Sequence, residues 1–137
     1  SYLTSMIGLD KRWLEPYGID PDTAFVALIP YSGQVVTHFE RRRELGLPDT
    51  QPLVDDMAPL SYVRPDCRPM LILSGDRERE MLGRYEENAY FWRMMRVAGH
   101  PDVRICEFDG FDHGNMPQAG HFVAVRYIRE MERRMDR

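Results

Sequence analysis

The sequence has no long apolar run and no excess of positive charge. Its longest apolar stretches, Phe25–Ile29 and Met70–Leu73, fall far short of the roughly 20 residues that a membrane-spanning helix needs, so we expect no membrane span. The formal net charge is −4, and glutamates flank the arginine run Arg41–Arg43. A positive field that gathers phosphates is therefore lacking, and we expect no nucleic acid as a partner.

Cysteine is scarce, and no targeting signal is recognisable. Cys67 and Cys106 are too few for a disulfide scaffold and too far apart for a zinc knuckle or a redox Cys-x-x-Cys pair. This usage favours a reducing compartment such as the cytoplasm. The first ten residues have no basic leader and no small-residue cleavage site, so we do not interpret them as a signal peptide.

Three segments have the length and composition of strands. Phe25–Ile29 and Met70–Leu73 are continuous apolar runs, which is typical of strands covered on both faces, and Val103–Phe108 is a third predicted strand. Segments with helical spacing lie before, between and after them. This alternation predicts the α/β fold class, with three parallel strands and flanking helices in a single domain that spans residues 1–137.

The predicted helices carry local signals of their own. Thr37 and Glu40 have the spacing of a capping box, which predicts a short helix that runs to Leu45. The last helix is amphipathic, with one charged face and one apolar stripe formed by Phe122, Val125, Ile128, Met131 and Met135. The other predicted helices are Tyr2–Leu9 and Arg84–Ala98, and Leu53–Val63 forms a short helix or turn.

Side chains that can do chemistry follow the second and third predicted strands. In open parallel sheets, functional groups gather beyond the carboxyl ends of the strands. Asp76 and Glu78 follow the second strand, and His113 follows the third. A histidine can act as general base for a hydroxyl nucleophile near neutral pH, and a carboxylate then fixes its tautomer. His113, His121 and Asp112 lack the spacing of a metal site, so we expect neither a metal nor a cofactor.

Three segments resemble the α/β-hydrolase superfamily. Leu71–Glu78 resembles its acid-bearing turn, in which the catalytic carboxylate stands three residues after a glycine; Glu78 holds that place, and Asp76 is its competitor. Gly110–Gly114 resembles the histidine loop of the esterase and lipase branch that includes carbohydrate and feruloyl esterase-like enzymes, with His113 at the catalytic position. Tyr2–Asp10 is similar to the helix that follows the nucleophile elbow.

The elbow itself is missing from the sequence. No serine has glycine at both positions two residues away, as the pattern Gly-x-Ser-x-Gly requires. The resemblance therefore covers nearly the whole chain but only the C-terminal part of the family's domain, with its strands six to eight. It implies a fragment of a serine carboxylic-ester hydrolase, acting on small-molecule esters, that supplies the triad histidine His113 and acid Glu78 and is inactive alone.

Two alternatives remain open at this point. The chain could be a non-catalytic interaction module or subunit that keeps the hydrolase architecture, or a fragment of an α/β-hydrolase peptidase, which shares the same turns. In the family's strand order, Phe25–Ile29 has lost a neighbour and presents an unpaired edge. We therefore expect this edge to support a homodimer or pairing with the absent N-terminal half.

Overall fold

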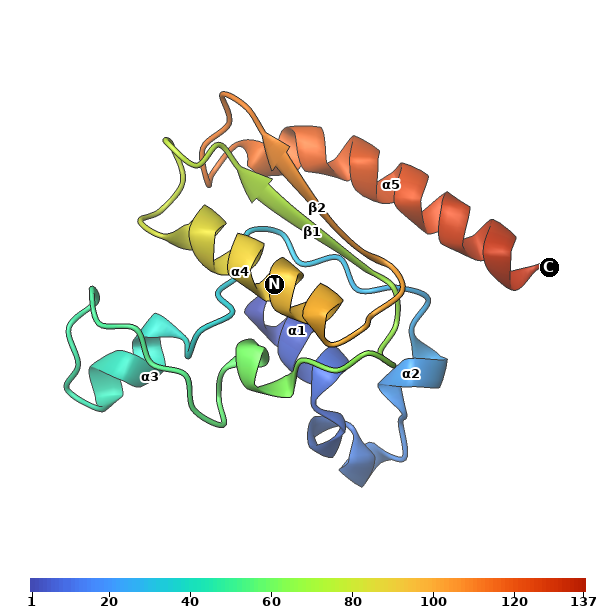
Figure 1. The fold of residues 1–137 in the computed structure, drawn as a ribbon, viewed down its shortest axis with the longest axis horizontal. Coiled ribbons are helices and arrows are strands. Elements are labelled where there is room, and N and C mark those ends of the chain that lie inside the picture. Colours follow the sequence, from blue (N-terminus) through green and yellow to red (C-terminus); the bar gives the residue numbers. More distant parts are fainter.

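A two-stranded parallel sheet lies at the centre of the computed structural model, which describes all residues from 1 to 137 (Figure 1). Strand β1, Met70–Gly75, pairs with β2, Val103–Phe108, in register from Met70 opposite Val103 to Gly75 opposite Phe108. Helix α4, Arg84–Val97, connects the two strands, and α5, Met116–Met135, follows β2. A parallel pair joined by a crossover helix is the β-α-β unit that the sequence predicts.

The first predicted strand contributes to this sheet only through isolated bridges. Leu28 and Tyr31 are in parallel register with Met70 and Leu73, on the side of β1 opposite β2. Pro30 has no N–H to donate, and its carbonyl accepts a hydrogen bond from Leu73 N (3.0 Å). The contact with β1 thus lies toward Leu28–Ser32, the C-terminal side of the predicted range Phe25–Ile29.

Helices cover both faces of the sheet. On one face, Met70 and Ile72 of β1 pack with Phe91 and Met95 of α4 and with Leu9 of α1, Tyr2–Leu9. On the other face, Leu71 and Leu73 pack against α5, whose buried core residues are Met116, Ala124, Tyr127 and Met131. All six residues of β1 are buried, as the continuous apolar run predicts.

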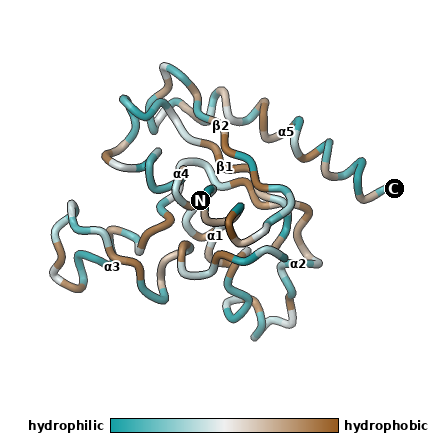
Figure 2. The backbone as a smooth tube through the Cα atoms, viewed as in Figure 1, coloured by the Kyte–Doolittle hydropathy of each residue, from teal (hydrophilic) through white to brown (hydrophobic).

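The apolar stripe predicted for α5 lies mostly outside this core. Phe122 is 76% exposed, and Val125, Ile128 and Met135 are also exposed, whereas Met131 is buried. Small residues, Gly120 and Ala124, approach the sheet instead. Figure 2 shows hydrophobic and hydrophilic segments alternating along α5. None of the helices combines the length and apolar character needed to cross a membrane.

The predicted capping box at Thr37 is wrong. Helix α3, Phe39–Glu44, has His38 as its N-cap, and His38 Nδ1 accepts from Glu40 N (3.3 Å). The Thr37 hydroxyl instead donates to Asp55 Oδ1 (2.6 Å). A tertiary partner thus takes the hydroxyl that the local pattern assigned to the helix.

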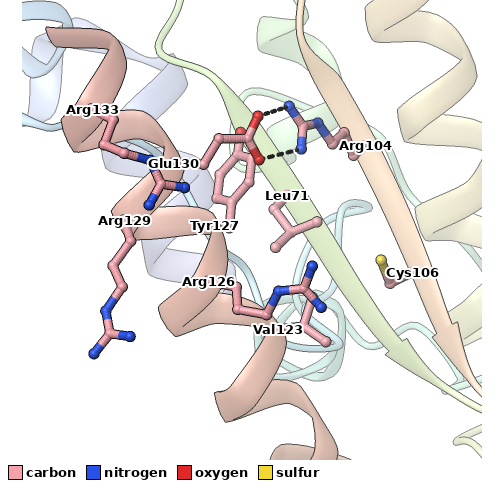
Figure 3. A pocket seen from close by; sticks show the side chains of 9 residues that line it. All are labelled: Leu71, Arg104, Cys106, Val123, Arg126, Tyr127, Arg129, Glu130 and Arg133. Atoms are coloured by element: carbon pink, nitrogen blue, oxygen red, sulfur yellow. Dashed lines mark hydrogen bonds and ion pairs between the residues drawn. The ribbon is translucent and has the colours of Figure 1, made fainter.

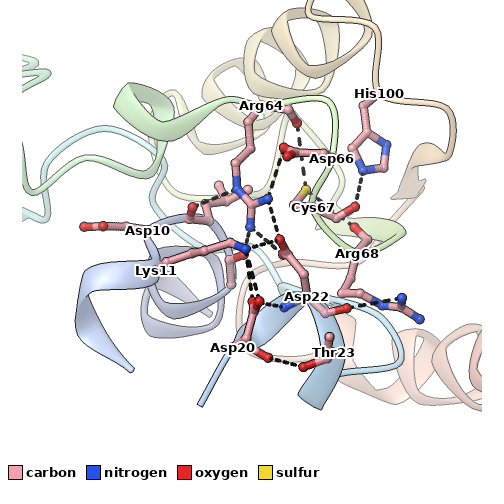
Figure 4. Close-up of polar contacts among 12 residues, drawn as sticks. Asp10, Lys11, Asp20, Asp22, Thr23, Arg64, Asp66, Cys67, Arg68 and His100 are labelled. Carbon is pink, nitrogen blue, oxygen red and sulfur yellow. Dashed lines mark hydrogen bonds and ion pairs between the residues drawn. The ribbon is translucent and has the colours of Figure 1, made fainter. Parts of the chain in front are cut away.

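A polar cluster fastens the N-terminal third to the segment before β1 (Figure 4). Arg64 forms a bidentate ion pair with Asp22 (2.6 and 2.9 Å) in α2, Pro21–Ala24, and donates to the carbonyls of Gly8 and Leu9 at the end of α1. The short helices of this region are 3-10 turns at Lys11–Trp13, Glu15–Tyr17 and Pro59–Tyr62. One guanidinium thereby satisfies helix-terminal carbonyls that would otherwise lack partners.

Candidate functional site

The loops that follow β1 and β2 meet at the carboxyl ends of the strands. Asp76 N donates to Phe111 O (2.8 Å), and Asp76 Oδ2 accepts from Gly110 N (2.8 Å). These bonds join the loop after β1 to the loop after β2. They bring the acidic segment and the histidine segment to the same edge of the sheet, where parallel α/β folds place functional groups.

His113 meets a carboxylate at this edge, and that carboxylate belongs to Glu80. Glu80 Oε2 lies 3.0 Å from His113 Nδ1. The imidazole is 44% exposed, whereas the Glu80 side chain is 0% exposed. The other ring nitrogen, His113 Nε2, has no hydrogen-bond partner within the chain. A buried carboxylate on Nδ1 and an accessible Nε2 form the arrangement in which a histidine can exchange a proton with a ligand.

Both oxygens of the buried Glu80 carboxylate accept hydrogen bonds. Oε1 accepts from Gly75 N (3.0 Å) and from the Ser32 hydroxyl, and Oε2 accepts from Met81 N (3.1 Å) and faces His113. Burial raises the pKa of Glu80, but the hydrogen bonds from Ser32, Gly75 and Met81 and the charge of His113 outweigh it. The net pKa lies below its ordinary value, so the group is an anion at neutral pH.

The structure does not bring Glu78 to His113. Glu78 is exposed on the turn, and its carboxylate has neither a hydrogen-bond nor an ion-pair partner within the chain. Asp76, the competing acid, accepts from Glu78 N (2.9 Å) and Gly110 N, and these backbone bonds hold its pKa below the ordinary value. Asp76 therefore links the two loops, and the carboxylate that lies next to His113 is that of Glu80, which the sequence analysis did not single out.

The shape of the turn explains why Glu80 was missed. The amides of Arg79 and Glu80 both donate to Asp76 O (2.9 and 2.8 Å), so the chain folds back on itself within five residues. This fold-back directs the Glu80 side chain toward Gly75. The family's spacing, three residues after the glycine, points instead to Glu78. The only local signal is that Glu80 precedes the apolar pair Met81 and Leu82, at the point where the acidic run ends.

Ser32 is a second residue that the sequence did not single out. Its side chain points to the acid and histidine, with Oγ donating to Glu80 and lying 3.3 Å from His113 Nδ1. The residue is 2% exposed and has a φ of 49°, a left-handed conformation that is uncommon outside glycine. Unusual backbone geometry of this kind is concentrated at functional sites.

A cavity of about 320 Å³ opens beside His113. It reaches the start of α1, because Ser1 and Tyr2 line it together with His113. Aromatic and polar side chains complete the wall. The remaining lining residues are Tyr31, Ser32, Gly33, Gln34, His38, Phe39, Met81 and Arg84.

Another groove, of about 460 Å³, lies between α5 and the sheet but holds no comparable group (Figure 3). Its wall carries the ion pair between Arg104 and Glu130 (2.8 Å), and Cys106, whose pKa burial raises. A thiol with a raised pKa is a poor nucleophile. Within the chain, no three His, Cys, Asp or Glu side chains are grouped so as to hold a metal ion.

The arrangement of strands and helices is that of part of an α/β-hydrolase, and the similar solved structures are esterases. They are structures of esterase 2 from Thermogutta terrifontis, a Planctomycetes species. The apo form matches with a TM-score of 0.58 and 23% identity, covering 77% of this chain and 42% of that one. The form phosphoramylated by tabun matches with a TM-score of 0.58 and 21% identity, covering 77% and 41%. The propionate-bound form has a TM-score of 0.57 and 20% identity, covering 77% and 42%.

These matches confirm the predicted partial α/β-hydrolase fold. At this level of identity they establish the fold alone, and the carbohydrate or feruloyl esterase branch stays a prediction. The chain spans less than half the length of the esterase chains that it matches. No family model matches the sequence, and no curated protein sequence is similar to it.

Proposed function

We propose that this chain supplies the histidine and acid of a serine carboxylic-ester hydrolase, with His113 as the general base and Glu80 as the acid that orients it. The observation that carries the proposal is the 3.0 Å contact between the buried Glu80 carboxylate and His113 Nδ1, with Nε2 left accessible. Glu80 replaces Glu78, the acid that the sequence suggested.

In this mechanism a serine hydroxyl gives its proton to His113 Nε2 while its oxygen attacks the acyl carbon of an ester. Glu80 accepts the Nδ1–H bond throughout and stabilises the imidazolium that forms. His113 then returns the proton to the departing alkoxide, and an acyl-enzyme remains for hydrolysis.

The nucleophile in this proposal belongs to a segment that precedes Ser1 in a longer protein. The support is that the start of α1 lines the same cavity as His113, and an elbow leading into that helix would project its side chain toward the cavity. Ser32 is the serine whose hydroxyl lies near the histidine, but it is buried, donates to Glu80 and approaches the same ring nitrogen as the acid. A nucleophile needs the opposite nitrogen, so Ser32 does not suit that role.

The test begins with the coding sequence immediately upstream of Ser1. We expect it to encode Gly-x-Ser-x-Gly, and the extended protein to hydrolyse p-nitrophenyl esters of short acids. In that protein, Glu80→Ala should lower kcat/KM by roughly 10³-fold or more, because the imidazole loses its orienting anion. Glu78→Ala is the matched control and should leave kcat/KM nearly unchanged. Full activity of the Glu80→Ala protein would sink the assignment.

We also propose that the segment Ala27–Ile29 is a pairing edge, for the rest of the hydrolase domain or for a second copy. Leu28 uses its N–H and C=O toward β1, with bonds to Pro69 O and Leu71 N, both 2.9 Å. The N–H and C=O groups of Ala27 and Ile29 make no hydrogen bond within the chain. An unpaired edge next to a buried strand is a template for another strand.

Sedimentation of the purified chain at several concentrations tests this edge. Ile29→Pro removes a free donor without breaking any bond the chain now has, so it should weaken association while the fold persists. A monomer at all concentrations, with the Ala27 and Ile29 amides strongly protected from hydrogen exchange, would argue against an open edge. The alternative in which the chain is a fragment of an α/β-hydrolase peptidase is not favoured by any particular residue of the site.

A further inference from the structure

We propose that Ser32 is a positioning residue that keeps the Glu80 carboxylate ionised and aimed at His113 whichever protonation state the histidine holds. The inference rests on the proposed function, because it assigns Ser32 to the acid–histidine pair described above. It starts from the contacts of the Ser32 side chain, which are directed to the acid first and to the histidine second.

The two carboxylate oxygens of Glu80 have different hydrogen-bond partners. Oε1 accepts hydrogen bonds from Ser32 Oγ and Gly75 N. Oε2 faces His113 Nδ1 (3.0 Å) and accepts from Met81 N. An anion taken wholly out of water costs several kcal/mol unless donors surround it. Ser32 supplies one of those donors from outside the acidic turn.

The position of the Ser32 hydroxyl is itself fixed by bonds to its backbone. Ser32 N donates to Leu73 O (2.7 Å), next to the end of β1, and Ser32 O accepts from the guanidinium of Arg84 in α4. Asn88, one turn further along α4, donates to Gly33 O (2.9 Å), and Glu87 Oε1 accepts from Val35 N (2.9 Å). Three side chains of one helix thus hold the loop 32–35 in place.

This anchoring explains why an L-residue occupies a left-handed conformation at position 32. With φ at 49°, the side chain leaves the backbone in the direction of Glu80, and glycine, the usual residue for this conformation, would leave Oε1 with one donor fewer. The cost of the left-handed backbone at Ser32 is offset by the hydrogen bond that its hydroxyl donates to Glu80. The same bonds leave Ser32 Oγ with no spare proton, because that proton is committed to Glu80.

The charged and titratable groups around this unit are few. Glu80 faces His113 directly, and Arg84 reaches the unit through the carbonyl of Ser32. Ser32→Ala should therefore act on Glu80 without changing any formal charge nearby. Removing one hydrogen bond from a carboxylate raises its pKa, since the anion loses a partner that the protonated acid does not need.

The experiment measures the Glu80 carboxyl pKa by ¹³C NMR of the full 137-residue chain. We expect Ser32→Ala to raise the Glu80 pKa, and Ser32→Gly to raise it as well while relieving the left-handed strain, so that folding and hydroxyl loss are separated. Ser61→Ala, which removes an exposed hydroxyl bonded to Asp55 O, is the control and should leave the Glu80 pKa unchanged.

An unchanged Glu80 pKa in both Ser32 variants would overturn this inference and leave the acid–histidine pair intact. The two proposals fail in distinguishable ways. If Glu80→Gln leaves the His113 ring signals unaltered, the pair itself is not formed, and the proposed function fails with it. If Glu80→Gln changes those signals but the Ser32 variants leave the Glu80 pKa as it was, only the role of Ser32 is lost.

Discussion

Glu80 and His113 are 33 positions apart in the chain, yet Glu80 Oε2 lies 3.0 Å from His113 Nδ1. The contact depends on the parallel pairing of β1 with β2, which ends both strands at the same edge, and on the fold-back of the loop that follows β1. Substitutions of Glu80 or His113 should therefore disrupt the contact, and so should changes to the backbone of the two loops that position them.

The tautomer of His113 is the first testable consequence. The Glu80 anion accepts a hydrogen bond from Nδ1–H and should hold the neutral ring in the Nδ1–H form, with Nε2 unprotonated. Glu80→Gln replaces an obligate acceptor with an amide that can donate, so the tautomer population should shift. Side-chain ¹⁵N shifts of the purified chain measure it. Glu78→Gln should give the native spectrum, and a shift of equal size in that variant would contradict the assignment.

Gly75 should tolerate no side chain. A Cβ at this position would lie 2.6 Å from Phe111 O and 3.0 Å from Glu80 Oε1, so Gly75→Ala must displace the histidine loop or the acid. We expect a loss of roughly 1–3 kcal/mol in the free energy of unfolding, as for an overpacked core, together with altered His113 signals. Urea denaturation measures the first effect.

Gly114→Ala provides the comparison in the same loop. A Cβ there would meet only Asp112 Oδ1 at 3.5 Å, an ordinary contact, and the residue does not need a left-handed conformation. Its unfolding free energy should stay within about 0.5 kcal/mol of the native value. Equal losses in the two alanine variants would show that the close approach at Gly75 is unimportant.

Stability should fall in acid partly through Glu130. Hydrogen bonds from Arg104 lower the pKa of Glu130 from 4.5 to about 2, and Arg134 contributes further. A folded-state pKa below the unfolded one stabilises the protein above the unfolded value, and the contribution disappears as the pH falls from 4.5 through 2. Glu130→Gln should flatten that part of the profile, measured by urea denaturation between pH 7 and pH 2.

The two loops should separate when Asp76 loses its charge. Backbone hydrogen bonds from Gly110 and Glu78 lower the pKa of Asp76, so its anion stabilises the loop pair at neutral pH and ceases to do so as the pH falls through the lowered pKa. Asp76→Ala should lower the Tm at pH 7 and increase hydrogen exchange at the Gly110 amide. An unchanged exchange rate at Gly110 would contradict this role.

Phe91 and Phe122 should respond very differently to truncation. Phe91 is fully buried against β1, whereas Phe122 is 76% exposed on α5. Phe91→Ala should cost about 3–5 kcal/mol of unfolding free energy, and Phe122→Ala should change it by less than about 0.5 kcal/mol in the monomer. A large loss for Phe122→Ala in dilute solution would mean that the exposed face of α5 is covered after all.

The elements of the fold were largely predictable from the sequence because their signals are local. Helix α4 and strand β2 end within a residue of their predicted limits, since apolar spacing and the glycines that follow define them. The bridges that Leu28 and Tyr31 make with β1 were harder to predict from the sequence. Pro30 has no N–H, and whether this breaks a hydrogen bond depends on which side of the segment faces β1. Burial on α5 likewise depends on how closely Gly120 approaches the sheet.

The site was predictable only in part. His113 follows from its place after a strand and between glycines, and the structure puts it at the sheet edge with an accessible nitrogen. Which carboxylate reaches His113 depends on the fold-back of the chain between Asp76 and Glu80, so the neighbouring carboxylates of Asp76, Glu78 and Glu80 have three different surroundings. Ser32 is separated from Glu80 by 48 positions, and no short-range pattern connects them.

Every donor that surrounds the Glu80 carboxylate comes from the stretch between Ser32 and His113. The hydrogen bonds around this carboxylate are therefore local to one stretch of the chain, whereas α1 and α5, which pack on the two faces of β1, lie outside it. A graft of residues 32–113 into another protein would carry the donors of Glu80 with it, but it would need new packing partners in place of α1 and α5.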